Sequence, residues 1–216
     1  MFSFLSPDSR FMQVISRITD LVLLNILFLL TCLPLFTAGA ATAALYSVCF
    51  RIFRNRESSI LKSYFRAFRD NFRQGTALWL LELLICVPGI VYFDTFWNME
   101  SPLRYLLAVI FTVLVLTEFT ASWAYPWISQ FRNNLPTVLR NSLILSLSHL
   151  PRSLALLLIR LLPLGLFLFQ PELFVRVSFL WFALYFSAAA FMCTAILWKV
   201  FKPFYPEETA EKAPLV

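Results

Sequence analysis

Long apolar runs separated by short polar connections dominate the chain. The clearest runs span residues 77–93, 103–128, 154–169 and 174–200, and they are apolar on every side rather than alternating. A helix needs about 20 apolar residues to cross a bilayer, whereas a membrane β-barrel shows short segments of alternating hydrophobicity. The pattern therefore predicts an all-α fold, a polytopic transmembrane helical bundle that forms a single domain over residues 1–203.

The first apolar run is too long for a single crossing. It extends from Leu21 to Phe50, and a straight helix of that length would measure about 45 Å, against about 30 Å for the hydrocarbon core. Pro34 lacks a backbone donor near the midpoint of the run, and Gly39 tolerates the backbone angles of a turn. We therefore predict a hairpin with its tip at residues 34–39. A re-entrant second arm, which turns back before the far side, is the alternative.

Small residues line one side of this second arm. They recur at Gly39, Ala40, Ala43 and Ala44, which is the small-xxx-small spacing of membrane helices that pack closely. The spacing predicts that another helix approaches the second arm at this face.

Lys and Arg residues gather in alternate connections. Residues 51–73 carry seven of them against two acidic residues, whereas residues 94–104 and 170–176 carry one each. Cytoplasmic connections collect Lys and Arg, so both chain ends and the connections at 51–73 and 131–152 are expected in the cytoplasm. This N-in/C-in arrangement places 15 of the 18 basic residues inside. The six predicted spans are residues 18–35, 38–54, 75–94, 103–128, 152–169 and 174–200.

Two cytoplasmic connections have the pattern of amphipathic interfacial helices. In the first, aromatic and basic residues alternate at helical spacing, which predicts one aromatic and one basic face. Such a helix rests on anionic lipid headgroups; a docking surface for a cytoplasmic partner is the alternative, and nucleic acid is not expected. The residues of this predicted surface are Lys62, Phe65, Arg66, Phe68, Arg69, Phe72 and Arg73.

The second amphipathic helix is predicted between residues 131 and 150. Asn134 is placed to be its N-cap and Pro136 falls in its first turn. Both connections contain the string Phe-Arg-x-Asn, at residues 68–71 and 131–134. The polar tail at residues 204–216 is expected to be disordered.

Composition narrows the function classes. Hydrophobic residues make up 60% of the chain and charged residues 14%, against about 25% charged residues in soluble domains. The four cysteines all fall in apolar runs without a C-x-x-C pair, and His149 is the sole histidine, so we expect no metal site and no cofactor. The sequence also lacks a phosphate loop and the motifs of hydrolases. We therefore expect a protein that is not an enzyme.

A few polar side chains interrupt the predicted spans. Ionisable groups inside a membrane are costly and are a functional hypothesis by default. At about 1.5 Å per residue, Glu82, Glu118 and Arg160 fall at similar depths in the inner half of the bilayer. We predict that Arg160 pairs with one of these glutamates, either to fix helix packing, to form a polar pocket for a solute or proton, or to face a water-filled vestibule. The predicted polar cluster comprises Asp20, Asn25, Glu82, Glu118 and Arg160.

Several strings of the chain resemble a known family. They are Arg17-x-x-Asp20 followed by Asn25, LPLFTAGAATAALY at residues 33–46, FRAFRDNFRQGTALW at residues 65–79, and the stretch from Tyr125-Pro126 to Pro151. The chain is similar in these strings to the YesL-like bacterial membrane proteins, domain of unknown function 624. The resemblance implies a small multi-pass protein of the bacterial cell membrane, whose genes lie near carbohydrate uptake systems. It implies no particular activity or binding residue.

Two functions follow as expectations. The first is an accessory of a carbohydrate uptake system of the ATP-binding-cassette type, with importer subunits and the lipid bilayer as partners. The second is a small solute transporter or channel that uses the polar pocket in the inner half of the bilayer.

Overall fold

The computed structural model describes residues 10–54, 59–97 and 105–205, and within these ranges every regular element is a helix. The all-α prediction is therefore confirmed. The α-helices are α1 (Arg10–Cys32), α2 (Ala38–Phe53), α3 (Ile60–Phe96), α4 (Leu106–Gln130), α5 (Leu135–Ser148), α6 (Leu150–Phe169), α7 (Pro171–Arg176), α8 (Ser178–Leu180) and α9 (Phe186–Phe201). Short 3-10 turns at Leu35–Thr37 and Lys202–Phe204 and a π-helical turn at Trp181–Tyr185 complete the order.

Six helical segments of the described chain are long and apolar enough to cross a membrane, as the sequence predicted. The segments are Ile15–Cys32, Leu35–Phe53, Ile60–Thr95, Leu106–Gln130, Leu150–Phe169 and Ser178–Phe204. The sixth is a composite in which α8, the π-helical turn and α9 follow one another. From residue 206 onward, the predicted polar tail lies outside the described residues.

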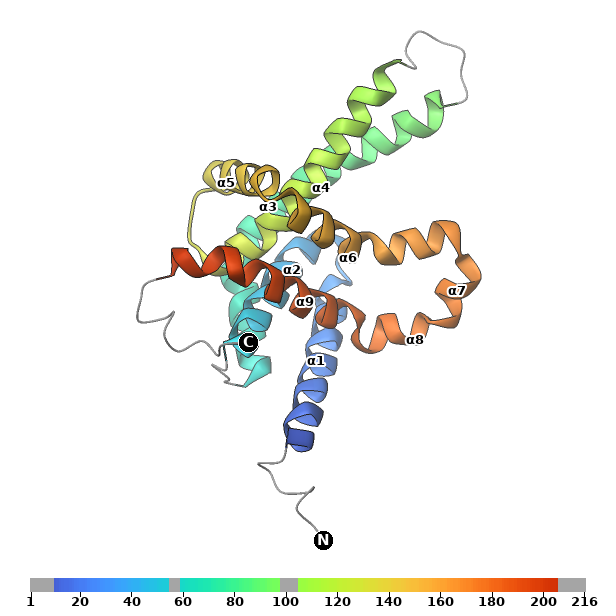
Figure 1. Cartoon of the computed structure of the whole chain (residues 1–216). Coiled ribbons are helices and arrows are strands. Elements are labelled where there is room, and N and C mark those ends of the chain that lie inside the picture. The colour runs from blue at the N-terminus through green and yellow to red at the C-terminus, as the bar shows by residue number, and fades with distance from the viewer. Residues whose placement is uncertain (1–9, 55–58, 98–104, 206–216) are drawn as a thin grey trace.

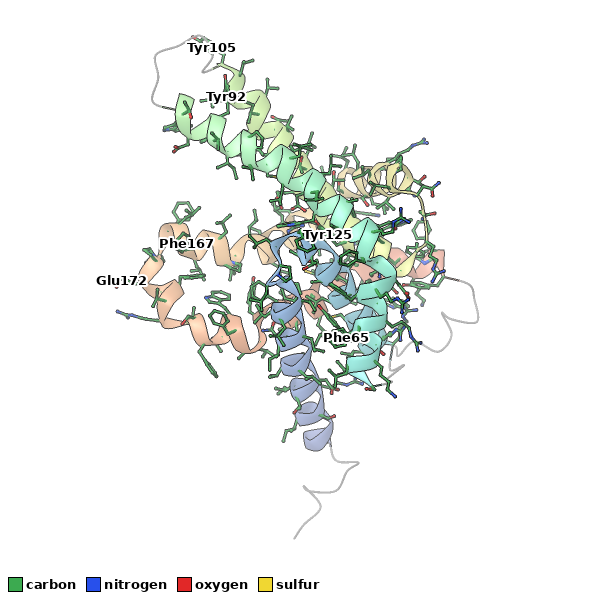
Figure 2. All side chains as sticks on the ribbon, turned by 180° about the vertical axis from the view of Figure 1, so that it is seen from behind. Phe65, Tyr92, Tyr105, Tyr125, Phe167 and Glu172 are labelled. Atoms are coloured by element: carbon green, nitrogen blue, oxygen red, sulfur yellow. The ribbon has the colours of Figure 1, made fainter. Side chains whose placement is uncertain are left out.

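Two helical hairpins project from a shared centre (Figure 1). The outer halves of α3 and α4 form one arm, and the chain from α6 through α9 forms the other. Tyr92 and Tyr105 lie near the end of the first arm, while Phe167 and Glu172 lie near the end of the second (Figure 2). The two arms point in different directions (Figure 1). Helices α1 and α2 lie near the place where the two arms meet.

The hairpin predicted in the first apolar run is present, but its turn differs in detail. The chain leaves α1 at Cys32, passes Pro34 and enters α2 at Ala38. The Thr37 hydroxyl closes this turn by contacting the carbonyl oxygens of Thr31 at 2.5 Å and Pro34 at 2.7 Å. Gly39 lies inside α2 rather than in the turn, which corrects the predicted reason for a glycine at this position.

The small residues of α2 allow close contact with α3. Gly39 and Ala40 are buried, and a Cβ added to Gly75 of α3 would lie only 2.7 Å from the Cα of Ala40. The two backbones therefore touch, as small residues permit in membrane helix pairs. This confirms the close approach predicted from the spacing and identifies Gly75 as the partner of Gly39.

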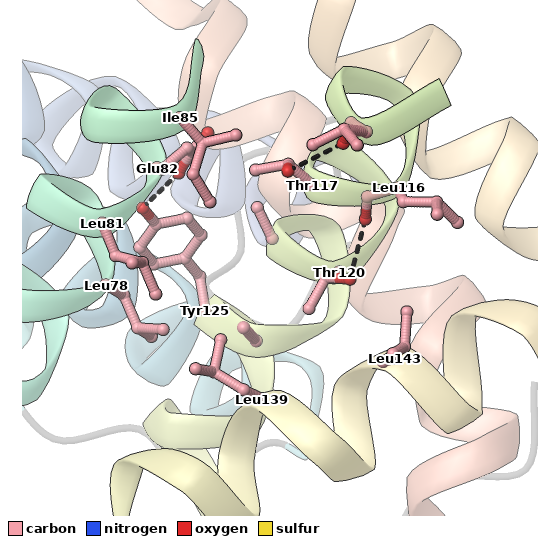
Figure 3. Close-up of a pocket in the computed structure, with 13 residues that line it drawn as sticks. Leu78, Leu81, Glu82, Ile85, Leu116, Thr117, Thr120, Tyr125, Leu139 and Leu143 are labelled. Atoms are coloured by element: carbon pink, nitrogen blue, oxygen red, sulfur yellow. Dashed lines mark hydrogen bonds between the residues drawn. The ribbon is translucent and has the colours of Figure 1, made fainter. Parts of the chain in front are cut away.

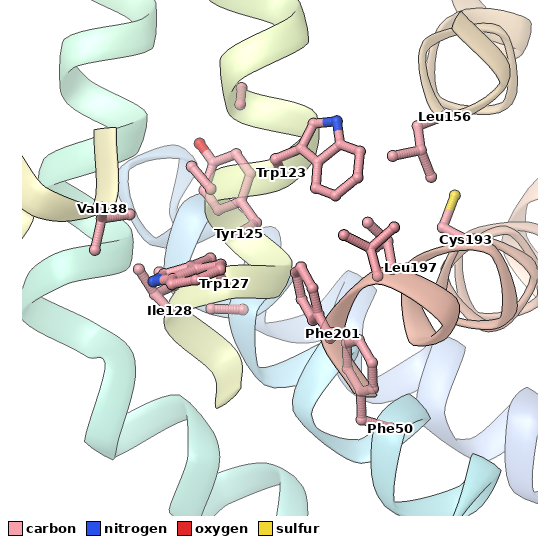
Figure 4. Packing of buried hydrophobic residues seen from close by; sticks show 14 of the residues in the cluster. Phe50, Trp123, Tyr125, Trp127, Ile128, Val138, Leu156, Cys193, Leu197 and Phe201 are labelled. Atoms are coloured by element: carbon pink, nitrogen blue, oxygen red, sulfur yellow. The ribbon is translucent and has the colours of Figure 1, made fainter. Parts of the chain in front are cut away.

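The helix α2 is shared between two apolar cores. On one side, Phe50 packs with Trp123 and Trp127 of α4 and with Phe201 of α9 (Figure 4). On the other, Val48 and its neighbours pack against α1 and the first turns of α3. Because α2 is buried between these cores, it holds α1, α3, α4 and α9 together.

The amphipathic segment before the third span is not a separate surface helix. It is continuous with that span, and α3 runs without interruption through 37 residues, a length of about 55 Å. The third span was predicted to begin as a new helix at residue 75, but α3 has no break there. Gly75 lies inside α3 and packs against α2. A helix is present as α5 where the second amphipathic helix was predicted, with Asn134 at the N-cap position and proline in the first turn.

Candidate functional site: an ion cluster between helices

Three ionisable side chains from three helices meet near the place where the two arms diverge. Glu82 comes from α3, Glu118 from α4 and Arg160 from α6. The Arg160 Nη2 donates to Glu82 Oε1, and its Nε lies 3.5 Å from Glu118 Oε2. Arg160 thus pairs with both glutamates, which confirms the predicted pairing.

Tyr125 of α4 completes the cluster. Its hydroxyl donates to Glu82 Oε2 at 2.5 Å, and its ring centroid lies 5.4 Å from the Arg160 guanidinium carbon. Tyr125 and Glu118 are seven residues apart on α4, close to two helical turns, and so they project from the same side. The tyrosine was absent from the predicted cluster, although this spacing on the same helix as Glu118 is a signal that could have found it.

The two glutamates are held unequally. Both carboxylate oxygens of Glu82 are bonded, and its side chain is only 7% exposed. Glu118 is 22% exposed, its Oε1 accepts from the Cys86 thiol at 3.8 Å, and its buried Oε2 receives no hydrogen bond from the described residues. Arg160 therefore binds Glu82 more closely than Glu118, and Glu118 keeps one oxygen without a hydrogen bond from the described residues.

Two cavities adjoin the cluster, and Tyr125 lines both. One, of about 320 Å³, lies among α3, α4 and α5 and is mainly apolar, with Glu82 in its wall (Figure 3). The other, of about 290 Å³, lies among α2, α4, α6 and α9 and reaches Arg160, whose side chain is 29% exposed. The ion cluster therefore has a small apolar space on one side and a space with a guanidinium wall on the other.

Asn25 of α1 belongs to a different contact. It is fully buried, and its Nδ2 donates to the carbonyl oxygens of Trp181 at 3.2 Å and Phe182 at 2.7 Å. Its Oδ1 accepts from the Ser187 backbone N–H at 3.0 Å. Trp181 and Phe182 lie in the π-helical turn and Ser187 follows it, so Asn25 binds the place where the regular backbone pattern is broken. Asn25 thus provides hydrogen-bond partners for backbone groups of an irregular helix and is not part of the ion cluster around Arg160.

Asp20 is half-buried on α1. The ion pairs of Arg160 are with Glu82 and Glu118. The structure therefore brings together three of the five residues of the predicted cluster. Within the described residues, no group of three or more His, Cys, Asp or Glu side chains is placed to hold a metal ion.

Comparison with known protein families gives a match for about a third of the chain. Residues 21–95 match DUF624, described as a protein of unknown function. This match confirms the YesL-like resemblance for residues 21–95, which comprise the second half of α1, all of α2 and nearly all of α3. No curated protein and no solved structure matches the chain.

The segment that matches DUF624 contains Glu82. The other two members of the ion cluster, Glu118 and Arg160, follow this segment in the chain. The matching segment also contains the predicted lipid or partner surface. Phe65 and Phe72 of that surface are exposed, as are its basic side chains, whereas Phe68 is half-buried and packs against the core beside Tyr64. Phe68 therefore serves the fold, and the exposed part of this surface is narrower than the sequence predicted.

Proposed function

We propose that this multi-pass membrane protein is a non-enzymatic accessory of another membrane complex, namely a carbohydrate importer of the ATP-binding-cassette type in the bacterial cell membrane. The shape of the chain carries this proposal. The two helical arms diverge instead of packing together, and both present apolar side chains outward, such as Val91 at 60% exposure and Phe179 at 78%. Membrane helices associate through van der Waals packing, so arms that do not pack on each other leave helix faces open to the helices of a partner.

The ion cluster has a structural role in this proposal. It links α3, α4 and α6 at the place where the arms separate, and Arg160 is neutralised by Glu82 and Glu118 within the chain. Groups paired in this way fix the relative positions of helices. The importer as partner is suggested by the YesL-like resemblance, and the arginine-rich connections favour the cytoplasm for both chain ends.

Site-specific photo-crosslinking tests the accessory role. A benzoylphenylalanine placed at Val91 or Phe179 in cells that co-express the importer permease subunits should crosslink the arms to those subunits. Ile144 of α5 is apolar and 51% exposed but lies outside both arms, so the same probe there is the control. Crosslinks from both arms and not from Ile144 support the proposal. If neither arm crosslinks although all subunits are present in the membrane, the proposal is contradicted.

A small solute transporter is the second candidate, favoured by the cavities on either side of Tyr125. In that function, Glu118 would contact the solute, since both oxygens of Glu82 are already bonded and one oxygen of Glu118 is not. Solute flux into liposomes that contain the purified chain alone supports transport, provided that Glu118→Gln reduces it. Flux that is absent from such liposomes, combined with crosslinking to importer subunits, decides for the accessory role.

A further inference from the structure

A second polar cavity lies apart from the ion cluster, at the arginine-rich end of the chain. It measures about 1100 Å³ and lies between α2, the first half of α3 and the segment that connects α4 to α5. A smaller cavity of about 380 Å³ shares Ser47, Arg51, Ser129 and Gln130 with it and extends toward Arg54. The two together form a continuous polar hollow, which we call the arginine cavity.

Both Phe-Arg-x-Asn strings of the sequence line the arginine cavity. Arg69, Asp70 and Asn71 come from the string on α3, and residues 131–134 supply the whole of the other. The Gln74 side-chain amide donates to the Asn133 carbonyl oxygen at 2.7 Å and joins the two walls. The repeated string, which the sequence alone left without explanation, thus supplies arginine and asparagine residues from two segments to the lining of one cavity.

The walls of this cavity carry an excess of positive charge. Five arginines line it against one carboxylate, that of Asp70. Two of the arginines have partners in the fold, because Arg54 bonds Gln130 and Tyr205 and Arg51 donates to Ser63 Oγ at 3.3 Å. The other three, which form no ion pair with a carboxylate of the described residues, are Arg69, Arg73 and Arg132.

The N-terminus of α5 also opens into this cavity. Asn134, Leu135 and Thr137 from the start of the helix are part of its lining. The Asn134 side chain makes no capping hydrogen bond, so it leaves the backbone N–H groups of Leu135 and Thr137 to other acceptors; Pro136 has no N–H. Helix N-termini favour anions, and guanidinium groups bind phosphate oxygens in a bidentate manner. Two independent features therefore select the same ligand charge.

We propose that the arginine cavity binds a phosphate group, which Arg69, Arg73 and Arg132 contact at the N-terminus of α5. The phosphate belongs either to a soluble phosphorylated compound or to the headgroup of an anionic phospholipid, and the chemistry of recognition is the same for both. Binding sites for small ligands commonly occupy about 300–1,000 Å³, so the cavity has room for more than the phosphate itself. This site is independent of the importer and of the ion cluster.

The experiment measures binding to the full chain in nanodiscs of phosphatidylcholine, which carry no net charge. Inorganic pyrophosphate and glucose 6-phosphate are the soluble probes, and nanodiscs with added phosphatidylglycerol are the lipid arm. Binding of a soluble probe is followed by isothermal titration calorimetry, and lipid retention by native mass spectrometry. Dependence of either signal on Arg69 and Arg132 supports the site, and the arm that responds identifies the source of the phosphate.

The test variant removes the two string arginines together, as Arg69→Gln with Arg132→Gln. Its control is Arg66→Gln with Arg140→Gln, which removes the same charge from α3 and α5 at exposed positions outside the cavity. The test variant should weaken the responding signal by at least about tenfold, as expected for the loss of charge-assisted contacts. The control should change it less than about twofold.

Two results overturn the proposal. The first is an equal loss in the test and control variants, which would mean that general surface charge attracts the probe. The second is the lack of any signal that depends on Arg69 and Arg132 in both arms, when circular dichroism and gel filtration show both variants folded like the parent chain.

Discussion

Removal of the Arg160 guanidinium tests whether the ion cluster stabilises the fold. In Arg160→Met, a shorter unbranched apolar side chain replaces the arginine, and two carboxylates remain without their cation. Glu82 keeps the Tyr125 hydroxyl but stays buried among apolar helices. Removing one partner of a buried pair costs about 3–5 kcal/mol. Because Arg160 and Glu118 are partly exposed, we expect the lower end, about 3 kcal/mol, or roughly a hundredfold decrease in the folding equilibrium constant.

A second substitution separates the ion pair from the packing of the side chains. Glu82→Gln in the Arg160→Met background removes the buried charge but keeps an acceptor for Tyr125. This double variant should therefore be more stable than Arg160→Met alone. Glu118→Gln in the parent chain should cost less than Arg160→Met, because its carboxylate lies 3.5 Å from Arg160 Nε and is partly exposed.

Unfolding in mixed micelles with a rising fraction of sodium dodecyl sulfate gives these free energies, with tryptophan fluorescence as the signal. Arg176→Met is the control, because Arg176 and Glu172 form an exposed pair at 3.6 Å with side chains 76% and 85% exposed. Loss of such a pair costs about 0–1 kcal/mol. A stabilising role of the ion cluster is refuted if Arg160→Met unfolds like the parent chain, or if the added Glu82→Gln destabilises Arg160→Met further.

Three further results are expected, the first two by the same unfolding assay. Gly75→Leu should cost about 1–3 kcal/mol or more, because its Cβ would lie 2.7 Å from the Cα of Ala40; a wild-type curve would contradict the backbone contact. Asn25→Leu should cost about 1–3 kcal/mol, since the Ser187 N–H and two carbonyl groups lose their partner; an unchanged midpoint would exclude that role. Burial raises the pKa of Tyr205 to about 12, so its neutral phenol stabilises the fold below about pH 10 and this contribution is lost as the pH rises toward 12. Tyr205→Phe should remove one tyrosine from the absorbance titration near pH 12, and an unchanged titration would refute this assignment.

Some of the fold follows from the sequence because membranes impose simple rules. A helix must be long enough to cross, and an arginine among apolar residues must find an anion. Those two requirements predict the six candidate spans and the pairing of Arg160 with Glu82 or Glu118, which are far apart from it in the chain. Pro34 likewise marks the turn, since it interrupts the backbone hydrogen bonds of a helix.

Contacts that depend on how helices rotate about their axes could not be predicted in the same way. The small residues of α2 predicted a close neighbour, but Gly75 became its partner only through the register of α3 against α2. Asn25 was grouped with the charges because of its depth, whereas its partners are backbone groups that a π-helical turn makes available. An irregular turn of this kind has no signature in an apolar run.

The geometry of the cluster also separates its two candidate functions. A carboxylate that binds a solute needs a free oxygen, and the bonds to Arg160 and Tyr125 occupy both oxygens of Glu82. Glu118 has a buried oxygen without a hydrogen bond from the described residues, and it is the more exposed carboxylate. Transport would therefore depend on Glu118, whereas the rigid link between the arms depends mainly on Glu82 and Arg160. A Glu118→Gln chain that still crosslinks to the importer subunits would show that the cluster serves as a joint.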